Sequence, residues 1–578
     1  MKISGSQLVL EALKKEGVDC LFGYPGGVVI PLFDELYKQD SIRLVLTRHE
    51  QAAVHAADGY ARSTGKTGVC LVTSGPGATN TITGLATANF DSVPLVVLTG
   101  QVPRSMIGND AFQEADTVGL TRPVTKHNYI VLDRAELGKT LKEAFYIANT
   151  GRPGPVVVDL PKDILIELAE GGYPEEISLK GYNPNTSGHT GQIKRVASAI
   201  KEAKKPVFFI GGGMHISGAS EIFRKVIDKV EIPTTVSLMG IGALPSNHPY
   251  NMGMLGMHGT YTANMSVSEC DLIIGIGVRF DDRVTGVLEK FAPNARIIHI
   301  DIDPASISRN VKVEIPIVGD AKQVLEELYP LLEKPAIDPW RKSVIQMVKD
   351  HPNPEDKSEK YLSPNNVIKA ISDVFSDAII CTEVGQHQMW TALEYKFSRP
   401  RSFITSGGLG TMGYGFPAAI GAQLANPDKK VINIAGDGSI QMNIQEMATC
   451  VQEGLPVIIA ILNNGYLGMV RQWQELFQDS RYSFTCLMRT PNCKHDCNGV
   501  KGEWCHPYTL DFVKLAEAYG AIGIRVTSSE EIVPALERAK LSTDRPVIID
   551  FIIERETNVW PMVPAGAAIN EMLLGKEK

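Results

Sequence analysis

The motif Gly436-Asp437-Gly438, followed by Asn463-Asn464 at the end of the next apolar run, constrains this chain more than any other feature. Residues 430–435 form a short apolar run of strand character, residues 439–453 have helical periodicity, and residues 456–462 form a second apolar run. A strand, helix and strand in this order close right-handed, so the two strands lie parallel with their carboxyl ends side by side. The side chains of Asp437 and Asn464 are therefore expected to meet there, over the amino end of the helix, which favours phosphate.

These side chains suit a metal-bound diphosphate. A carboxylate oxygen from Asp437, an amide oxygen from Asn464 and the backbone carbonyl of Tyr466 are ligands for octahedral Mg²⁺, with diphosphate oxygens in the other positions. The alternative is an ordinary strand–helix–strand unit with a glycine-rich bend. Gly-Asp-Gly alone is a weak signal, and the Asn-Asn pair at this spacing strengthens it. The sequence thus predicts a clamp for diphosphate and Mg²⁺.

The length of the chain and its alternating pattern predict the architecture. A chain of 578 residues holds about three domains at roughly 150–200 residues each. Strand-like and helix-like segments alternate nearly throughout, which favours an α/β fold with parallel sheets. Two polar stretches rich in Pro and Gly, 170–192 and 335–365, are expected to be linkers, the second with a helix of its own. The expected domains are 1–168, 190–335 and 364–555, followed by a C-terminal tail, 556–578.

Charge and hydropathy exclude two classes of partner. The net charge of −8 argues against a nucleic-acid ligand. No apolar run reaches the roughly 18 residues that span a membrane, so no membrane partner is expected.

The first residues lead directly into an amphipathic helix, 7–16, without a targeting leader, and a cytoplasmic location is therefore predicted.

The spacing of the glycine and asparagine motifs resembles that of thiamin diphosphate (ThDP) enzymes. The resemblance implies an activating carboxylate, and Arg48-His49-Glu50-Gln51-Ala52-Ala53, after the strand 43–46, looks like that element. In that family the glutamate bonds N1′ of the aminopyrimidine, and a buried carboxyl there acts as a general acid and base of raised pKa. The alternative for Glu50 is an acid in a helix's first turn, favoured by the helix dipole. The resemblance also implies that Glu50 and the Asp437 clamp come from different subunits of a homodimer, with a tetramer as the alternative assembly.

The middle of the chain has the loose outline of a dinucleotide site. The strand 205–210 leads into Gly211-Gly212-Gly213, and the strand 297–300 leads into Asp301-Ile302-Asp303. This is not a true Gly-x-Gly-x-x-Gly unit, and a plain α/β domain with tight turns is the alternative. Residues 253–259 and 277–286 both resemble FAD-binding segments of one branch of the ThDP superfamily. We therefore predict a central FAD-binding, Rossmann-like domain between two related ThDP-binding domains.

That branch is the acetohydroxyacid synthase (acetolactate synthase) family, its large catalytic subunit, which the chain resembles over nearly its whole length. The matching segments are 112–116, 121–128, 385–390, 407–415 and 468–474. The resemblance implies that pyruvate is decarboxylated on ThDP and that the hydroxyethyl unit passes to a second pyruvate or to 2-ketobutyrate. It implies a role in the first common step of valine, leucine and isoleucine synthesis. FAD would be required without turning over, and any feedback regulation would need a separate small subunit.

The resemblance carries the site residues with it. The residues implied at ThDP are Glu50, Gln386, His387, Gly410, Met412, Gly436, Asp437, Gly438, Ser439 and Asn464. The residues implied at FAD are Arg152, Gly211, Gly212, Gly213, Leu255, Gly256, His258, Gly277, Arg279, Asp281, Arg283, Asp301, Ile302 and Asp320. Glu50, Gln113 and Lys162 are implied as catalytic groups, with Phe112, Met257, Arg283 and Trp473 at the substrate. Arg283 suits bidentate carboxylate binding, and Met257 and Trp473 would favour the larger acceptor. The alternative for these two side chains is ordinary core packing.

The cysteines fall into two groups. Cys20, Cys70, Cys270, Cys381 and Cys450 are scattered and are expected to be small buried hydrophobic residues. The other four lie in a segment, 486–508, that departs from the family pattern as an insertion. Cys486, Cys493, Cys497 and Cys505 could bind Zn²⁺ in a tetrahedral site. An Fe–S site, a redox-labile disulfide and an inert loop are the alternatives.

Several other functions remain open at this point. A pyruvate oxidase, a glyoxylate carboligase and the flavin-free catabolic acetolactate synthase use related sites. Glu50 disfavours the carboligase, and the flavin-like segment 277–286 disfavours the flavin-free enzyme. A catalytically silent regulatory paralogue is the remaining alternative, which the presence of Glu50, Asp437, Asn464 and Trp473 disfavours.

Overall fold

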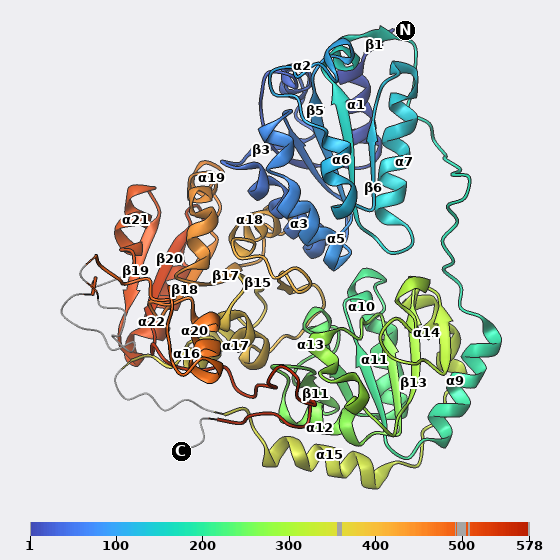
Figure 1. Ribbon diagram of the computed structural model, residues 1–578, viewed down its shortest axis with the longest axis vertical. Coiled ribbons are helices and arrows are strands. Elements are labelled where there is room, and N and C mark those ends of the chain that lie inside the picture. Colours follow the sequence, from blue (N-terminus) through green and yellow to red (C-terminus); the bar gives the residue numbers. More distant parts are fainter. Residues whose placement is uncertain (1, 355–360, 492, 494–504, 507–508, 576–578) are drawn as a thin grey trace.

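The computed structural model describes residues 2–354, 361–491, 493, 505–506 and 509–575. These residues form three α/β lobes, each built on a six-stranded sheet whose paired strands all run parallel (Figure 1). The predicted α/β fold of three domains with parallel sheets is confirmed. The strands read as near-continuous apolar runs because helices cover both faces of such sheets.

The first and third sheets have the same connectivity. The first has the spatial order β3 (Arg43–Leu46), β2 (Cys20–Tyr24), β4 (Gly68–Val72), β5 (Leu95–Gln101), β7 (Pro155–Pro161), β6 (His127–Ile130). The third has the order β16 (Phe403–Ile404), β15 (Ile379–Thr382), β17 (Val431–Gly436), β18 (Ile458–Asn463), β20 (Val547–Ile552), β19 (Ile522–Val526). Numbered within each sheet along the chain, both orders are 2-1-3-4-6-5. The two domains predicted to be related thus correspond to two lobes with one topology.

The middle sheet has a different strand order from the other two. Its order is β11 (Asn251–Met254), β10 (Thr234–Val236), β9 (Pro206–Ile210), β12 (Leu272–Ile276), β13 (Arg296–Asp301), β14 (Ile315–Val318). Numbered within the sheet along the chain, this is 3-2-1-4-5-6, the order of the Rossmann fold. A two-stranded antiparallel ribbon of β1 (Ile3–Ser4) and β8 (Leu168–Ala169) closes the first lobe.

Helices cover the sheets and connect the lobes. In the first lobe the main helices are α1 (Gly5–Lys15), α2 (Ile30–Tyr37), α3 (Glu50–Thr64), α5 (Ile82–Asp91) and α7 (Leu137–Asn149), with the short α8 (Lys162–Ile166) after β7. In the middle lobe they are α9 (Thr190–Glu202), α11 (Ser220–Val230), α12 (Tyr261–Glu269) and α14 (Ala321–Leu328). In the third lobe they are α16 (Pro364–Val374), α17 (Gln386–Glu394), α18 (Gly415–Ala425), α19 (Met447–Gln452), α20 (Gly468–Phe477), α21 (Phe512–Ala518) and α22 (Ser529–Lys540). The helix expected within the second linker is α15 (Asp338–Asp350), at the bottom of Figure 1.

The first and third lobes meet at a close crossing of α3 and α18. A Cβ atom added to Gly421 would lie 1.8 Å from the carbonyl oxygen of Ala56, and one added to Gly59 would lie 2.0 Å from that of Ala418. The two backbones therefore approach closely only because both helices carry glycine here. This crossing fixes α3, which begins with Glu50, against the lobe that carries the clamp.

The segment 439–453 differs from the single helix that its periodicity predicts. It forms a 3-10 helix, Ser439–Glu446, that breaks at Asn443 (φ −133°) before α19 begins. The side chain of Asn443 donates a 2.6 Å hydrogen bond to the carbonyl oxygen of Gly413, on a distant loop. This long-range contact stabilises a backbone conformation that the local pattern does not reveal.

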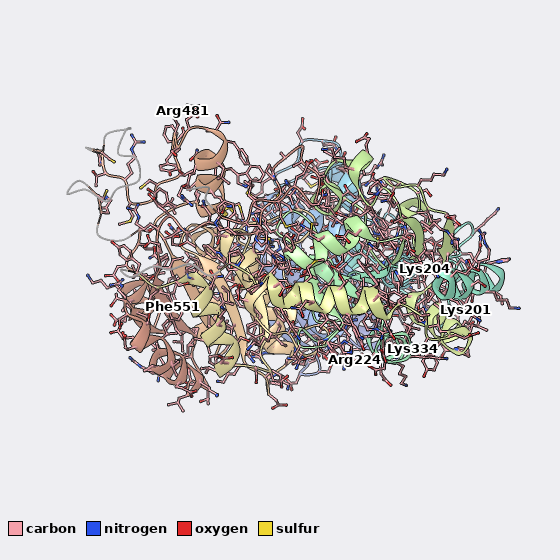
Figure 2. All side chains as sticks on the ribbon, turned by 90° about the horizontal axis from the view of Figure 1, so that it is seen from below. Lys201, Lys204, Arg224, Lys334, Arg481 and Phe551 are labelled. Atoms are coloured by element: carbon pink, nitrogen blue, oxygen red, sulfur yellow. The ribbon has the colours of Figure 1, made fainter. Side chains whose placement is uncertain are left out.

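The basic residues at the outer edge of the middle lobe are in part paired with acids. Figure 2 places Lys201, Lys204, Arg224 and Lys334 at this edge, with Arg481 on a projection at the opposite end of the molecule. Lys201 Nζ lies 2.8 Å from Glu333, and Lys334 Nζ lies 2.6 Å from Glu231. Within the part of the chain that the structure describes, none of the helices combines the length and the apolar character that crossing a membrane requires.

Candidate active site

The residues predicted to form the clamp lie at the carboxyl ends of β17 and β18. Gly436 pairs with Leu462 across the two strands, so the residues that follow each strand lie side by side. Asp437 is buried, and its Oδ2 accepts hydrogen bonds from Gly465 N (3.1 Å) and from the hydroxyl of Thr509 (2.7 Å). The Oδ1 atom of Asn464 accepts from Tyr466 N at 3.0 Å. Asp437, Asn464 and Tyr466 line one pocket.

The chemistry of this donor set fits a divalent cation. Burial raises the pKa of Asp437 to about 7. Among the described residues, no Lys, Arg or His forms an ion pair with Asp437. A bound cation would stabilise the ionised carboxylate, and hard oxygen donors from Asp437, Asn464 and the Tyr466 carbonyl match the preference of Mg²⁺.

The clamp opens into a small pocket of about 70 Å³ that suits a diphosphate. Its walls include Gln386, His387, Met412, Gly436, Asp437, Gly438, Ser439 and Asn464, all of which the sequence predicts at ThDP. The Nε2 atom of His387 is buried and makes no protein hydrogen bond, and burial lowers the pKa of this imidazole to about 3. A buried ring nitrogen without a protein partner suits a polar group of a bound ligand. Gly410 lines the neighbouring, larger cavity instead.

The larger cavity, of about 530 Å³, lies where the three lobes meet. Apart from Gly211 and Gly256, every residue predicted at FAD lines it: Arg152, Gly212, Gly213, Leu255, His258, Gly277, Arg279, Asp281, Arg283, Asp301, Ile302 and Asp320. Gly211 packs instead against the next turn, where a Cβ atom would lie 2.4 Å from the carbonyl oxygen of Gly277. Asp281 Oδ1 is buried without a protein partner, and burial raises the pKa of this carboxyl. A cavity with glycine turns and polar groups at the edge of a Rossmann-type sheet fits a flavin dinucleotide.

Three residues predicted at the substrate lie together at one wall of this cavity. The guanidinium carbon of Arg283 is 5.8 Å from the centroid of the Trp473 ring, and Arg283 Nη1 is 3.5 Å from the sulfur of Met257. Val384, Gly385, Met412, Met469 and Val470 line both the larger cavity and the diphosphate pocket. The two spaces are therefore neighbours, with Met412 between them.

The remaining predicted residues lie on the first lobe and line neither of these two spaces. Glu50 begins α3, and its Oε2 accepts a 2.9 Å hydrogen bond from the side chain of Asn80. Gln113 lies against the turn at Gly75, where a Cβ atom would be 2.9 Å from the Gln113 Cα. Lys162 begins α8, and Phe112 is 87% exposed. One chain thus carries two separate groups of predicted site residues, each at the carboxyl edge of a parallel sheet.

The sequence gives no signal for several other cavity walls. Phe90, Asp91 and Ser92 at the end of α5 line the larger cavity, as does Met239 of the middle lobe. Glu383, after β15, is fully buried and holds a loop beside the cavity. Contacts between lobes bring these residues to the site, and no local motif marks them.

The cysteines follow the sequence prediction in part. Cys20, Cys70, Cys270, Cys381 and Cys450 are buried and free, as expected. In the insertion, Cys486, Cys493 and Cys505 are partly exposed, while Cys497 lies outside the described residues. No group of three or more His, Cys, Asp or Glu side chains that could hold a metal occurs in the described part of the chain. The predicted zinc site therefore has no support from the structure.

The fold and the clamp together define a ThDP-dependent enzyme. Three family models match the chain: the thiamine pyrophosphate enzyme N-terminal TPP binding domain over residues 3–120, the central domain over 193–328, and the C-terminal TPP binding domain over 383–551.

Related proteins show to which family of ThDP-dependent enzymes the chain belongs. The acetolactate synthase large subunit of Haemophilus influenzae is 48% identical over 584 residues, which cover 100% of this chain and 99% of that protein. The acetolactate synthase isozyme 3 large subunit of Escherichia coli is 47% identical over 99% of both chains. A probable acetolactate synthase large subunit of Methanocaldococcus jannaschii is 47% identical over 99% of this chain and 95% of its own. The chain belongs to the acetolactate synthase large subunit family, as its motifs predict.

Proposed function

We propose that this chain is the catalytic subunit of an acetolactate synthase in branched-chain amino acid synthesis. It decarboxylates pyruvate and transfers the hydroxyethyl unit to a second 2-keto acid, pyruvate or 2-ketobutyrate. The observation that carries the proposal is the arrangement of the site. A buried Asp437–Asn464 clamp lies next to a larger cavity in which Arg283, Met257 and Trp473 are gathered.

The clamp holds Mg²⁺ and the diphosphate of ThDP. Asp437, Asn464 and the carbonyl of Tyr466 would supply oxygen ligands, and His387 and Ser439 line the same pocket. ThDP, when bound, supplies a carbon nucleophile for the ketone carbonyl of pyruvate and an electron sink for the loss of CO₂. Burial of this pocket excludes water, which strengthens each of these electrostatic contacts.

The larger cavity holds FAD, with Gly212, Gly213 and Gly277 at its glycine turns and Asp301 and Asp320 at the carboxyl edge of the middle sheet. The three lobes all contribute to its walls. A ligand that bridges them would stabilise their arrangement by its binding free energy. This is consistent with a flavin that is required without being oxidised or reduced.

Arg283 anchors the substrate carboxylate, and Trp473 and Met257 form the apolar side that selects the acceptor. One added methylene in an apolar pocket is worth about 1–3 kcal/mol. Replacing Trp473 by Leu is therefore expected to lower the preference for 2-ketobutyrate over pyruvate by about tenfold or more. Product ratios from mixtures of the two acceptors measure this preference. An unchanged product ratio in Trp473→Leu would show that the indole does not take part in acceptor selection.

The second group of residues serves the site of a second copy. Glu50 exchanges a proton with the aminopyrimidine through its carboxylate, and Phe112, Gln113 and Lys162 complete the mouth of the site from the same lobe. The support is that all four lie at one edge of the first lobe and line neither cofactor space of their own chain. The working assembly is thus a homodimer, or a tetramer built from two such dimers. A cytoplasmic location and a separate small regulatory subunit stay predictions.

The direct test is acetolactate formation from pyruvate with ThDP, Mg²⁺ and FAD. The wild-type chain should form product, and Asp437→Ala should form none above background. Oxygen uptake measured in the same assay distinguishes an oxidase from a synthase. No product from the wild-type chain at saturating cofactors would contradict the proposal.

A further inference from the structure

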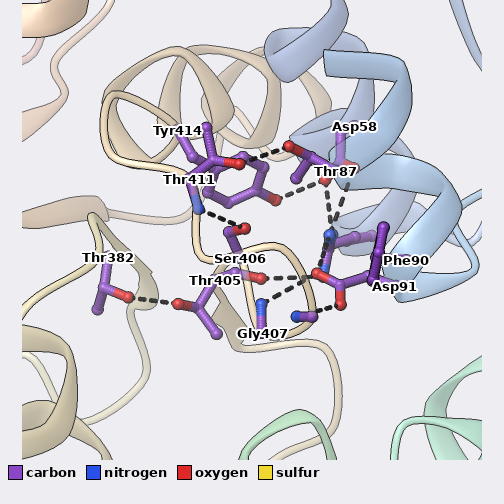
Figure 3. A network of polar contacts seen from close by, with 12 residues as sticks. Asp58, Thr87, Phe90, Asp91, Thr382, Thr405, Ser406, Gly407, Thr411 and Tyr414 are labelled. Atoms are coloured by element: carbon purple, nitrogen blue, oxygen red, sulfur yellow. Dashed lines mark hydrogen bonds and ion pairs between the residues drawn. The ribbon is translucent and has the colours of Figure 1, made fainter. Parts of the chain in front are cut away.

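One segment, residues 405–416, separates the two cofactor spaces and ends with the first two residues of α18; we call it the Met412 loop. Ser406, Gly407 and Gly410 line the larger cavity, and Met412 lines both spaces. The position of this loop therefore affects both cofactors. Figure 3 shows the polar network that holds it against the helices of the first lobe.

The amino-terminal end of the loop is held by Asp91, the last residue of α5. Its Oδ2 accepts the backbone N–H of Gly407 at 3.0 Å, and its Oδ1 accepts that of Gly408 at 2.8 Å (Figure 3). A Cβ atom on Gly408 would lie 2.8 Å from the Cβ of Phe90 and 2.9 Å from Asp91 Oδ1. The close approach of backbone to carboxylate thus requires glycine at this position. Asp91 itself lines the larger cavity.

Asp91 is in turn oriented by Arg62 of α3. The guanidinium bonds Asp91 Oδ2 at 2.9 Å, Asp58 Oδ1 at 2.6 Å and the carbonyl oxygen of Thr405 at 3.0 Å. Both carboxylate side chains are fully buried, and that of Arg62 is 10% exposed. Asp58 also accepts the hydroxyl of Tyr414 at the other end of the loop. Two buried carboxylates sharing one guanidinium need further donors, and the loop supplies them.

The middle and far end of the loop are held as well. The hydroxyl groups of Thr87 and Thr411 lie 2.7 Å apart, and Thr411 N donates to Ser406 Oγ at 3.0 Å. Glu383 accepts the backbone N–H of Gly413 at 2.7 Å and that of Phe416 at 2.9 Å. The loop is therefore held by a buried carboxylate at each end, one from the first lobe and one from the third.

We infer that Asp91 is a positioning residue that holds the Met412 loop and links occupancy of the larger cavity to affinity at the diphosphate pocket. The reason is geometric: one side chain forms part of the cavity wall and also bonds the loop that separates the two spaces. A ligand that orders this wall orders the loop, and the second cofactor then binds to a loop already in place. The coupling is reciprocal, so each cofactor, ThDP or FAD, raises the affinity of the protein for the other cofactor. The inference rests on the proposed function, because it takes these two cofactors as the ligands.

The test measures the Kd of ThDP, with Mg²⁺ present, for the full-length protein with and without saturating FAD. In the wild type, FAD should lower this Kd by about tenfold, so the ratio of the Kd without FAD to the Kd with FAD should be about 10. Asp91→Asn keeps the size of the side chain but cannot accept both loop N–H groups and Arg62, so the ratio should fall to about 1. Asp377→Asn, in the exposed ion pair with Arg399, is the matched control and should keep the wild-type ratio.

A second variant covers the case in which Asp91→Asn fails to fold. Thr87→Val is nearly isosteric and removes the hydroxyl contact with Thr411, together with the local bond to the Thr83 carbonyl oxygen within α5. It should reduce the ratio by about threefold. A loss of overall stability alone would not change a ratio of two affinities measured on the folded protein. A wild-type ratio in either folded variant, or a wild-type protein that binds both cofactors independently, would overturn the inference. A wild type that binds neither cofactor would instead overturn the proposed function.

Discussion

At the scale of single residues, Thr509 makes a contact at the clamp that no motif predicts. Its hydroxyl donates to Asp437 Oδ2 at 2.7 Å and so fixes the orientation of the proposed metal ligand. Partners of this kind typically change metal affinity by about 10–100-fold. Thr509→Val should therefore raise the Mg²⁺ concentration for half-maximal activity by about tenfold. Thr150→Val, which removes a hydroxyl bonded to Tyr146 O, is the control. Equal Mg²⁺ dependence in all three proteins would contradict this role.

Asp159 is expected to give the stability of the protein a distinct pH dependence. It is fully buried on β7, and burial raises its pKa to about 7 despite hydrogen bonds from Thr99 and Gln101. Between an unfolded pKa near 3.8 and this value the folded state binds the extra proton, so stability falls as the pH rises. The slope from this one group is about 1.4 kcal/mol per pH unit.

Asp159→Asn removes that titration. Thermal midpoints of the cofactor-free proteins, measured from pH 5 to 8, should therefore shift in favour of the variant as the pH rises. A constant difference between the two proteins over this range would show that Asp159 stays ionised in the folded state.

At the scale of elements, the crossing of α3 and α18 should be intolerant of a single methyl group. Gly→Ala in a helix normally stabilises it by about 1 kcal/mol. In Gly421→Ala the new Cβ would meet the carbonyl oxygen of Ala56, and such overpacking costs about 1–3 kcal/mol or more. The thermal midpoint should fall, whereas Gly172→Ala, with open space around it, should leave it unchanged. A raised midpoint in Gly421→Ala would mean that the helices lie further apart.

The elements themselves were largely predictable. The strand 43–46 has the predicted bounds, and β9, β13, β17 and β18 begin and end within about two residues of their apolar runs. These strands are predictable because buried parallel strands leave continuous apolar runs in the sequence. The backbone of residues 439–453 could not be predicted. The helix breaks at Asn443, whose side chain bonds the carbonyl oxygen of Gly413, although the sequence periodicity indicates one continuous helix. Such a bond joins two distant parts of the chain, and a local pattern does not reveal it.

At the scale of the whole molecule, the sequence predicts each set of site residues but not the spaces between them. The clamp motif suffices to place Asp437 beside Asn464, because β17 and β18 are neighbouring parallel strands. The walls made by Phe90, Asp91 and Glu383 could not be predicted, since they depend on how three lobes pack. The topology shared by the first and third sheets explains why one chain presents two groups of site residues.

The central claim is that a working site joins Glu50 of one copy to the Asp437 clamp of another. Glu50→Gln and Asp437→Ala should each be inactive alone. When they are co-expressed with different tags and purified through both tags, each mixed dimer contains one intact site and one doubly altered site. Acetolactate formation by this mixed dimer should reach about half of the wild-type rate. Activity no higher than that of either single variant would show that Glu50 does not act on the clamp of a second copy.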